Sequence, residues 1–167
     1  MPLRSDWSDD LCPVRRSLDV LGDGWVLLII RDVLHGRGRF DTLRDNLGIS
    51  DAVLNRRLRS MVEADLLERV DYSDGGRTRQ GYAATVAGAE LLPVLQQLAI
   101  WGERHTVTPP DGGHMALIHE ACGSETTRGE ICSACGEPLV PEEMSWDKPW
   151  RGRRDRLVAA GELHSPR

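Results

Sequence analysis

The stretch "GISDAVLNRRLRSMVEADLLERVDYSDGGRTRQGYAAT", residues 48–85, decides the fold of this chain. Ser50 is of a type that commonly caps a helix N-terminus, and the apolar residues after it recur at helical spacing. At about 100° per residue, one inward face collects Leu54, Leu58, Met61 and Val62. The sequence therefore predicts a helix over residues 51–64 with a polar, arginine-rich outward face.

A β-hairpin is predicted directly after this helix. "LLERVDY" (66–72) and "RQGYAAT" (79–85) are strand-like, and they flank "SDGG" (73–76). Asp74-Gly75 within that segment is typical of a tight hairpin turn.

Three helices are predicted before residue 48. "CPVRRSLDVLG" has Pro13 at a first helical position and apolar residues at Val14, Leu18 and Leu21. "WVLLIIRDVLHG" is apolar nearly all round, which indicates a central buried helix ended by Gly36. "FDTLRDNLG" is a brief third helix, for which we expect Asp41 as the N-cap.

A long helix is predicted after the hairpin. Thr85 can cap "VAGAELLPVLQQLAIWGERH" (86–105), and Pro93 is expected to bend it because proline removes a backbone donor. An apolar stripe along this helix contains Leu91, Leu95, Leu98 and Trp101.

A short helix, a glycine-containing turn, a second helix and a hairpin together form the order of a winged helix-turn-helix. The second helix of such a unit fits the DNA major groove, where Arg and Asn pair with base edges. Arg77 and Arg79 of the hairpin, or wing, would then lie near phosphates. Residues 50–82 nevertheless hold six arginines and six acids, so a merely solvated arginine-rich helix is the alternative.

The region from about residue 11 to 105 resembles the HxlR-type winged-helix transcriptional regulators, relatives of the MarR group. The resemblance is carried by the "CPV" opening, "LGDGW", "RF" with "TL", the spaced pattern of "GISDAVLNRRLRSM", and "LPVLQQLAIWGERH". The wing departs from the family pattern: "DGGRTRQGY" lacks the expected proline pair and has Gly81 in place of a glutamate.

This resemblance implies a sequence-specific DNA-binding regulator, expected to be a repressor, that acts as a homodimer through its first and last helices. Two recognition helices would then read a near-palindromic operator, with a small molecule or electrophile as a candidate inducer. The groove-facing residues carried over by position are Ser50, Asp51, Asn55, Arg56, Arg57 and Arg59.

Cys12 lies at a predicted helix start, where unpaired N–H groups and the nearby Arg15 and Arg16 would favour a thiolate. Several regulators that the chain resembles sense oxidants or electrophiles through a cysteine at this position. A small cysteine also packs well in an interface, so a purely structural role is the alternative.

The remaining cysteines form a candidate metal site in "HEACGSETTRGEICSACGEP", residues 119–138. His119 and Cys122, then Cys132 and Cys135, are two closely spaced ligand pairs, and each pair is followed by a glycine. This pattern matches a closed, tetrahedral Zn²⁺ site with a structural role. A labile Cys132–Cys135 disulfide and unliganded thiols are the alternatives.

We therefore expect an α+β, mainly α protein in four parts: a winged-helix and dimerisation domain (1–105), a linker (106–115), a zinc-ribbon-like module (116–145) and a basic, disordered tail (146–167). The rival function is a redox or electrophile sensor with output through the zinc module. An enzyme is not expected, because no catalytic constellation is evident. No run of ~20 apolar residues is present, and the opening "MPLRSDWSDD" lacks the apolar core of a secretory signal, so we expect a cytoplasmic protein. The net charge of -5 argues against a protein covered in positive charge but leaves room for a local basic face.

Overall fold

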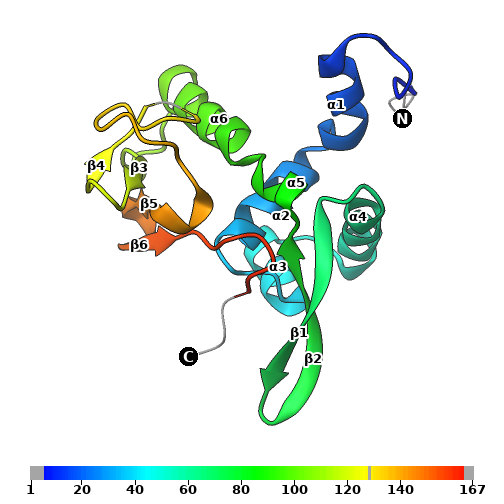
Figure 1. The fold of residues 1–167 in the computed structure, drawn as a ribbon. Helices are drawn as coiled ribbons and strands as arrows, with labels where there is room; N and C mark the ends of the chain where they lie inside the picture. Colours follow the sequence, from blue (N-terminus) through cyan, green and yellow to red (C-terminus); the bar gives the residue numbers. More distant parts are fainter. Residues whose placement is uncertain (1–5, 128, 164–167) are drawn as a thin grey trace.

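The computed structural model describes residues 6–127 and 129–163 as a mixed α+β fold. Its helical half contains α1 (Pro13–Leu21), α2 (Gly24–Leu34), α3 (Phe40–Leu47) and α4 (Asp51–Glu63). A long hairpin of β1 (Leu67–Asp74) and β2 (Arg77–Ala84) projects away from these helices (Figure 1). Two further helices, α5 (Val86–Ala89) and α6 (Leu92–His105), lead into the C-terminal half.

Helix α2 is the centre of the core, as its apolar sequence predicts. Val26, Ile29, Ile30, Val33 and Leu34 are all buried, and α3, α4, the hairpin and α6 pack around them. The inward face of α4 adds Leu54, Leu58 and Met61, while Val62 packs partly buried beside them. The winged helix-turn-helix expected from residues 48–85 is confirmed.

Two local predictions about the helices are wrong. Asp41 is not the cap of α3, because the helix begins one residue earlier at Phe40 with Arg39 as its N-cap. The long helix expected over 86–105 is interrupted at Glu90 and Leu91, and Pro93 lies in the first turn of α6. Helix α1 is present as predicted, and none of its residues is buried in the chain.

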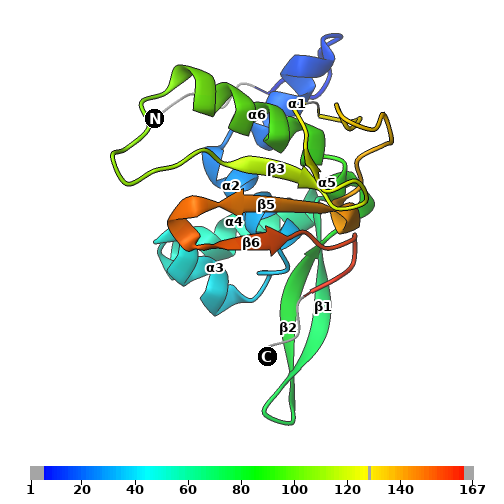
Figure 2. The ribbon, with the colours of Figure 1, turned by 90° about the vertical axis from the view of Figure 1, so that its left-hand side faces the viewer.

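The C-terminal half forms a four-stranded antiparallel sheet of order β4-β3-β5-β6. Its strands are β3 (Ala116–His119), β4 (Ser124–Glu125), β5 (Met144–Lys148) and β6 (Arg153–Arg156), with the 3₁₀ turns η1 (Pro141–Glu143) and η2 (Pro149–Arg151) around β5. Figure 2 shows β3, β5 and β6 side by side, with α6 above β3.

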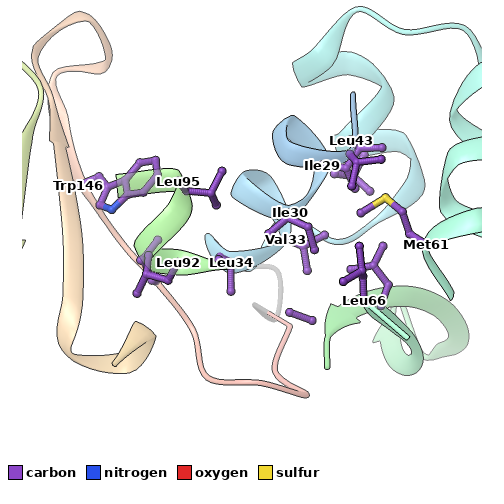
Figure 3. Close-up of a cluster of buried hydrophobic side chains, with 14 of the residues drawn as sticks. Ile29, Ile30, Val33, Leu34, Leu43, Met61, Leu66, Leu92, Leu95 and Trp146 are labelled. Atoms are coloured by element: carbon purple, nitrogen blue, oxygen red, sulfur yellow. The ribbon is translucent and has the colours of Figure 1, made fainter. Parts of the chain in front are cut away.

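This sheet shares one hydrophobic core with the helical half. Trp146 of β5 lies beside Leu92 and Leu95 of α6 (Figure 3), and the same buried cluster continues to Leu34 of α2. Leu157 and Met144 belong to it as well.

The disordered tail expected from residue 146 onward is therefore wrong for the described residues. Residue 146 lies in the middle of β5, and β6 follows, with register Lys148↔Arg153. Met144, Ser145, Trp146 and Lys148 of β5 are buried. The backbone of Val158 donates to Leu34 O at 2.7 Å. Residues 164–167 of that expected tail lie outside the described residues.

Candidate DNA-reading face and metal centre

The turn before α4 fixes how its outward face is presented. Gly48 adopts a left-handed φ of 62°, which ends α3, and Ile49 is buried beneath the turn. The Ser50 hydroxyl accepts from Val53 N at 3.4 Å, so Ser50 is the N-cap that the sequence predicts. The buried leucines then leave the opposite face of α4 to solvent.

The predicted groove residues on α4 fall into two groups. Arg56 and Arg59 are exposed, and within the described residues no hydrogen bond or ion pair holds either guanidinium group. Arg57 instead lies on the flank and pairs with Asp23, the N-cap of α2. Arg57 thus ties α4 to α2.

The N-terminal end of α4 carries the remaining predicted contacts. Ser50, Asp51 and Asn55 are exposed, but each is engaged locally. Asn55 Nδ2 donates to Asp51 O at 3.0 Å, and the Asp51 carboxylate lies 3.8 Å from Arg44 of α3.

The wing is a regular two-stranded hairpin. Its register runs from Leu67↔Ala84 to Asp74↔Arg77, so the turn residues are Gly75 and Gly76, both with positive φ. Arg77 is exposed at the tip, while Arg79 Nε lies 3.2 Å from the Asp74 carboxylate. The tip therefore presents one unpaired cation among the described contacts.

The wing's departure from the family pattern has a packing reason. A Cβ on Gly81 would lie 2.9 Å from Leu163 and 3.3 Å from Gly38 O. The neighbouring Tyr82 N donates to Gly38 O at 2.8 Å. The C-terminal segment thus occupies the space that a side chain at residue 81 would need.

Four candidate ligands meet at one point in the C-terminal half. His119 Nδ1 lies 3.5 Å from Cys122 Sγ and 3.4 Å from Cys135 Sγ, and Cys122 Sγ lies 3.7 Å from Cys132 Sγ. All four ligand atoms lie within 4.8 Å of one another, as the sequence spacing predicts. The cluster could hold a metal ion.

Backbone turns hold these ligands in place. Gly123 N donates to His119 O and Gly136 N donates to Cys132 O, and both glycines have positive φ. The imidazole of His119 is buried, and its Nε2 lies 3.5 Å from Glu143 Oε2. A carboxylate at that position orients a ligating imidazole.

The same turns favour thiolates at Cys132 and Cys122. Hydrogen bonding from the backbone of Cys135 lowers the pKa of the Cys132 thiol to about 6. The backbone of Ser124 likewise lowers the pKa of Cys122. No disulfide joins the described cysteines, all of which are free thiols.

Cys12 is exposed as the N-cap of α1, as its position predicts. Its backbone N–H donates to Asp10 at 2.8 Å. Arg15 pairs with Asp10, and Arg16 donates to backbone carbonyls, so neither guanidinium is directed at the thiol by these contacts.

Exposed apolar side chains gather on α1 and α6. Leu11, Val14 and Leu18 are exposed near α1, and Leu98 and Trp101 are exposed on α6. Leu95 differs from its neighbours in the predicted stripe, because it is buried in the chain's own core.

Sequence reasoning missed a buried polar cluster that joins the two halves. His35 Nε2 lies 3.0 Å from Lys148 Nζ, and Asp155 lies 2.7 Å from Arg37 and 3.7 Å from Lys148. Trp146 packs edge-on against His35 at 4.9 Å between ring centroids. One signal was available, since Lys148 is the chain's single lysine.

The fold and its exposed helix face define a winged helix-turn-helix protein of the DNA-binding class. The HxlR-like helix-turn-helix family matches residues 20–109, and the chain belongs to that family. It is a transcriptional regulator by family. None of the described helices has the length and apolarity that a bilayer crossing requires.

Similar proteins extend the match beyond the winged helix. An uncharacterized HTH-type transcriptional regulator of Mycobacterium tuberculosis, Rv3095, is 35% identical over 147 residues, which are 88% of this chain and 91% of the relative. The crystal structure of PA1607, provisionally named a transcription factor, matches with a TM-score of 0.66 at 34% identity, over 83% of this chain and 96% of that one. Both matches must include much of the region after residue 105.

A third similar structure covers the winged helix alone. The redox regulator HypR in its oxidized form matches with a TM-score of 0.52 at 28% identity, over 58% of this chain and all of its own length.

Proposed function

We propose that this regulator binds a near-palindromic operator as a homodimer, with α4 in the major groove and the wing against adjacent phosphates. The observation that carries the proposal is the outward face of α4, where Arg56 and Arg59 are exposed and unpaired among the described residues. Arginine in this setting can pair with guanine edges or with phosphates. Repression follows most simply, because a dimer on an operator can exclude polymerase.

The α4 proposal is tested by substituting its arginines one at a time. We expect Arg56→Ala and Arg59→Ala each to weaken binding to the chain's own promoter DNA by roughly tenfold, and each to reduce the salt slope if the contact is to phosphate. Glu90→Ala, an exposed substitution away from α4, is the matched control. Unchanged affinity of both arginine variants at fixed salt would refute the assignment.

Arg57→Ala should behave differently from those variants. Because its guanidinium pairs with Asp23, we expect this substitution to lower stability as well as DNA affinity. Thermal unfolding measured beside the binding assay separates the two effects.

The dimer is supported by the exposed apolar residues of α1 and α6. Leu98 and Trp101 expose about half of their surface, which a monomer leaves in water at a cost. We expect Leu98→Glu to convert a dimer into a monomer in analytical ultracentrifugation. Val86→Glu, at a more exposed position on α5, is the control, and a dimer that survives Leu98→Glu would place the interface elsewhere.

We propose that the cysteine and histidine cluster holds structural Zn²⁺. Tetrahedral zinc with Zn–S of about 2.3 Å and Zn–N of about 2.0 Å separates sulfur atoms by about 3.8 Å and sulfur from nitrogen by about 3.5 Å. The spacings of 3.7, 3.5 and 3.4 Å in the cluster fit those edges. Four protein ligands leave no open position, so the ion would organise the fold.

Metal analysis tests the zinc proposal. We expect close to one zinc per chain in protein purified without added metal, and Cys132→Ser together with Cys135→Ser should abolish it. A zinc content far below one per chain in the unaltered protein would exclude the closed site.

A second candidate function, redox or electrophile sensing, rests on the exposed thiol of Cys12. The similar protein HypR is a redox regulator by name. We propose that modification of Cys12 changes the packing of α1 and thereby DNA binding, with the zinc module as a further output. If Cys12→Ser leaves the DNA-binding response to diamide unchanged, Cys12 is not the sensor.

A further inference from the structure

A cavity of about 560 Å³ lies between the end of α6, the segment 106–115 and η2. Its walls are largely apolar, with contributions from Val107, Met115 and the indole of Trp150. Trp150 lines the cavity and is half exposed, so part of its indole is open to an occupant. This volume and this lining are typical of a small-molecule site.

The charged residues that line the cavity, in the part of the chain that the structure describes, are both acidic. They are Glu103 of α6 and Asp111. Glu103 accepts from Met115 N at 3.0 Å and lies 3.6 Å from His114 Nδ1, and His114 also contacts Glu125 at 2.6 Å. One imidazole shared by two carboxylates leaves negative charge at the cavity wall.

The cavity faces away from the surface assigned to the dimer. Val94, Leu98 and Trp101 lie on one side of α6, whereas Ala99, Gly102 and Thr106 line the cavity about 120° around the helix. Dimerisation through the first group would therefore leave the cavity open.

We propose that this cavity binds a small lipophilic cation with a planar aromatic body. The aromatic body would stack on Trp150 and lie among the apolar walls, and the positive charge would lie beside Glu103 and Asp111. An indole face and a carboxylate are the two groups that attract an organic cation most directly.

The cavity is connected by direct contacts to the helix-turn-helix. Trp150 is adjacent in η2 to Arg151, whose Nη2 donates to Asn46 Oδ1 at 2.6 Å. Asn46 Nδ2 in turn donates to the buried Asp32 at 2.5 Å. Asn46 lies in the last turn of α3, two residues before the Gly48 turn that sets α4.

An occupant that displaces Trp150 would therefore alter how η2 holds α3. The cation would act as the inducer and weaken operator binding, a step that rests on the proposed DNA-binding function. The binding step itself does not depend on DNA, so the two can be tested separately.

Binding is tested by calorimetry on the full-length protein without DNA. The probes share one naphthalene body: (1-naphthylmethyl)trimethylammonium as the cation, 1-naphthylmethanol as the neutral compound and 1-naphthoate as the anion. We expect the cation to bind most tightly and the anion least. The proposal is overturned if all three probes bind equally well, or if the cation does not bind at millimolar concentration.

Substitutions locate the site. Trp150→Ala should lower the affinity for the cation by roughly fivefold to thirtyfold. Trp150→Phe should retain most of the affinity. Glu103→Gln should lower the affinity for the cation roughly threefold or more and leave the affinity for the neutral probe unchanged. Glu90→Gln, at an exposed position, should change neither affinity. Wild-type affinity in both Trp150→Ala and Glu103→Gln would place binding outside this cavity.

The regulatory step is tested by operator binding with and without the cation. We expect the cation to weaken operator binding of the unaltered protein, and Glu103→Gln to require a roughly threefold or higher cation concentration for the same effect. An effect of the cation on DNA itself would instead appear at the same concentration with both proteins. Arg151→Ala should retain cation binding and lose the response. If the cation binds but does not change operator affinity, the inducer role is overturned. If the unaltered protein does not bind operator at all, the proposed function is refuted, and the calorimetric result on cation binding still stands.

Discussion

At the scale of single residues, His35 shows how the two halves of the chain depend on each other. Burial, reinforced by the charge of Lys148, lowers the pKa of His35 to about 3. Its Nδ1 lies 2.6 Å from Arg31 O, so the neutral ring can donate there and accept from Lys148 through Nε2. Burial also lowers the pKa of Lys148 to about 8.

Asp155 balances these cations. Burial alone would raise the pKa of Asp155, but hydrogen bonding and charge from Arg37 hold it below its usual value. The carboxylate stays ionised between Arg37 and Lys148, and it brings β6 against the loop that follows α2. Removing one partner would leave buried charge uncompensated.

This arrangement predicts a specific loss of stability in acid. The pKa of His35 is lower in the folded state than in the unfolded chain, so its contribution is complete above pH 6.5 and falls as the pH drops toward 3. At pH 5 we expect a loss of about 2 kcal/mol from this group.

Chemical denaturation at pH 7.5 and pH 5 measures the loss. His35→Gln removes the titration and should show a smaller difference between the two pH values. His105→Gln, at an exposed position, should retain the full difference. A His35→Gln variant as acid-sensitive as the unaltered protein would assign the loss to other groups.

At the scale of elements, the sequence predicted those helices and turns that depend on residues close together in the chain. The α4 helix and the wing follow from the Ser50 cap, the spacing of Leu54 and Leu58, and two glycines in the turn. The break between α5 and α6 was less predictable, because Pro93 is compatible with either a bent helix or a new first turn. Its position was decided by packing, since Gly88 lies directly against Leu66 O.

The candidate metal ligands were also predictable, because closely spaced ligand pairs and their glycines are local features. The buried cluster of His35, Lys148 and Asp155 was not, because His35 is separated from the other two by more than a hundred residues along the chain. Their pairing depends on the register of β5 against β6 and on how the sheet meets α2.

The loop between α2 and α3 is predicted to set the direction of the wing. A Cβ on Gly38 would overlap the carbonyl oxygen of Tyr82 in β2, which is backbone and cannot rotate away. We expect Gly38→Ala to destabilise the protein by roughly 2 kcal/mol or more. It should also weaken DNA binding at temperatures where the protein remains folded, because the base of the wing must move.

Thermal unfolding and operator binding of Gly38→Ala test this expectation. Gly24→Ala is the control, because no atom lies within 4 Å of a Cβ at that position. Its stability should stay within about 0.5 kcal/mol of the unaltered protein. Equal stability of the two variants would show that the loop adjusts without moving β2.

At the scale of the whole molecule, the C-terminal half is part of the DNA-binding domain's core. Strand β5 runs from the candidate metal centre, where Met144 pairs with His119, to Lys148 at the end of α2. Between these ends Trp146 covers Leu92 and Leu95 (Figure 3). The many charged residues among 146–156 suggested a solvated tail. A sequence does not show whether a charged residue pairs with a residue far away in the chain or lies in solvent.

If the cysteine and histidine cluster holds zinc as proposed, one core predicts one unfolding transition that depends on the metal. Loss of the ion would release the turns around His119 and Cys132, and with them the strand that covers α6. We expect Cys132→Ser with Cys135→Ser, or chelation of the unaltered protein, to lower the midpoint of the whole transition by roughly 10 °C. Circular dichroism would follow the helices, and tryptophan fluorescence would follow the sheet. Cys12→Ser, outside the cluster, should leave the midpoint unchanged, whereas an independent module would instead give a separate early transition with the helices unaffected.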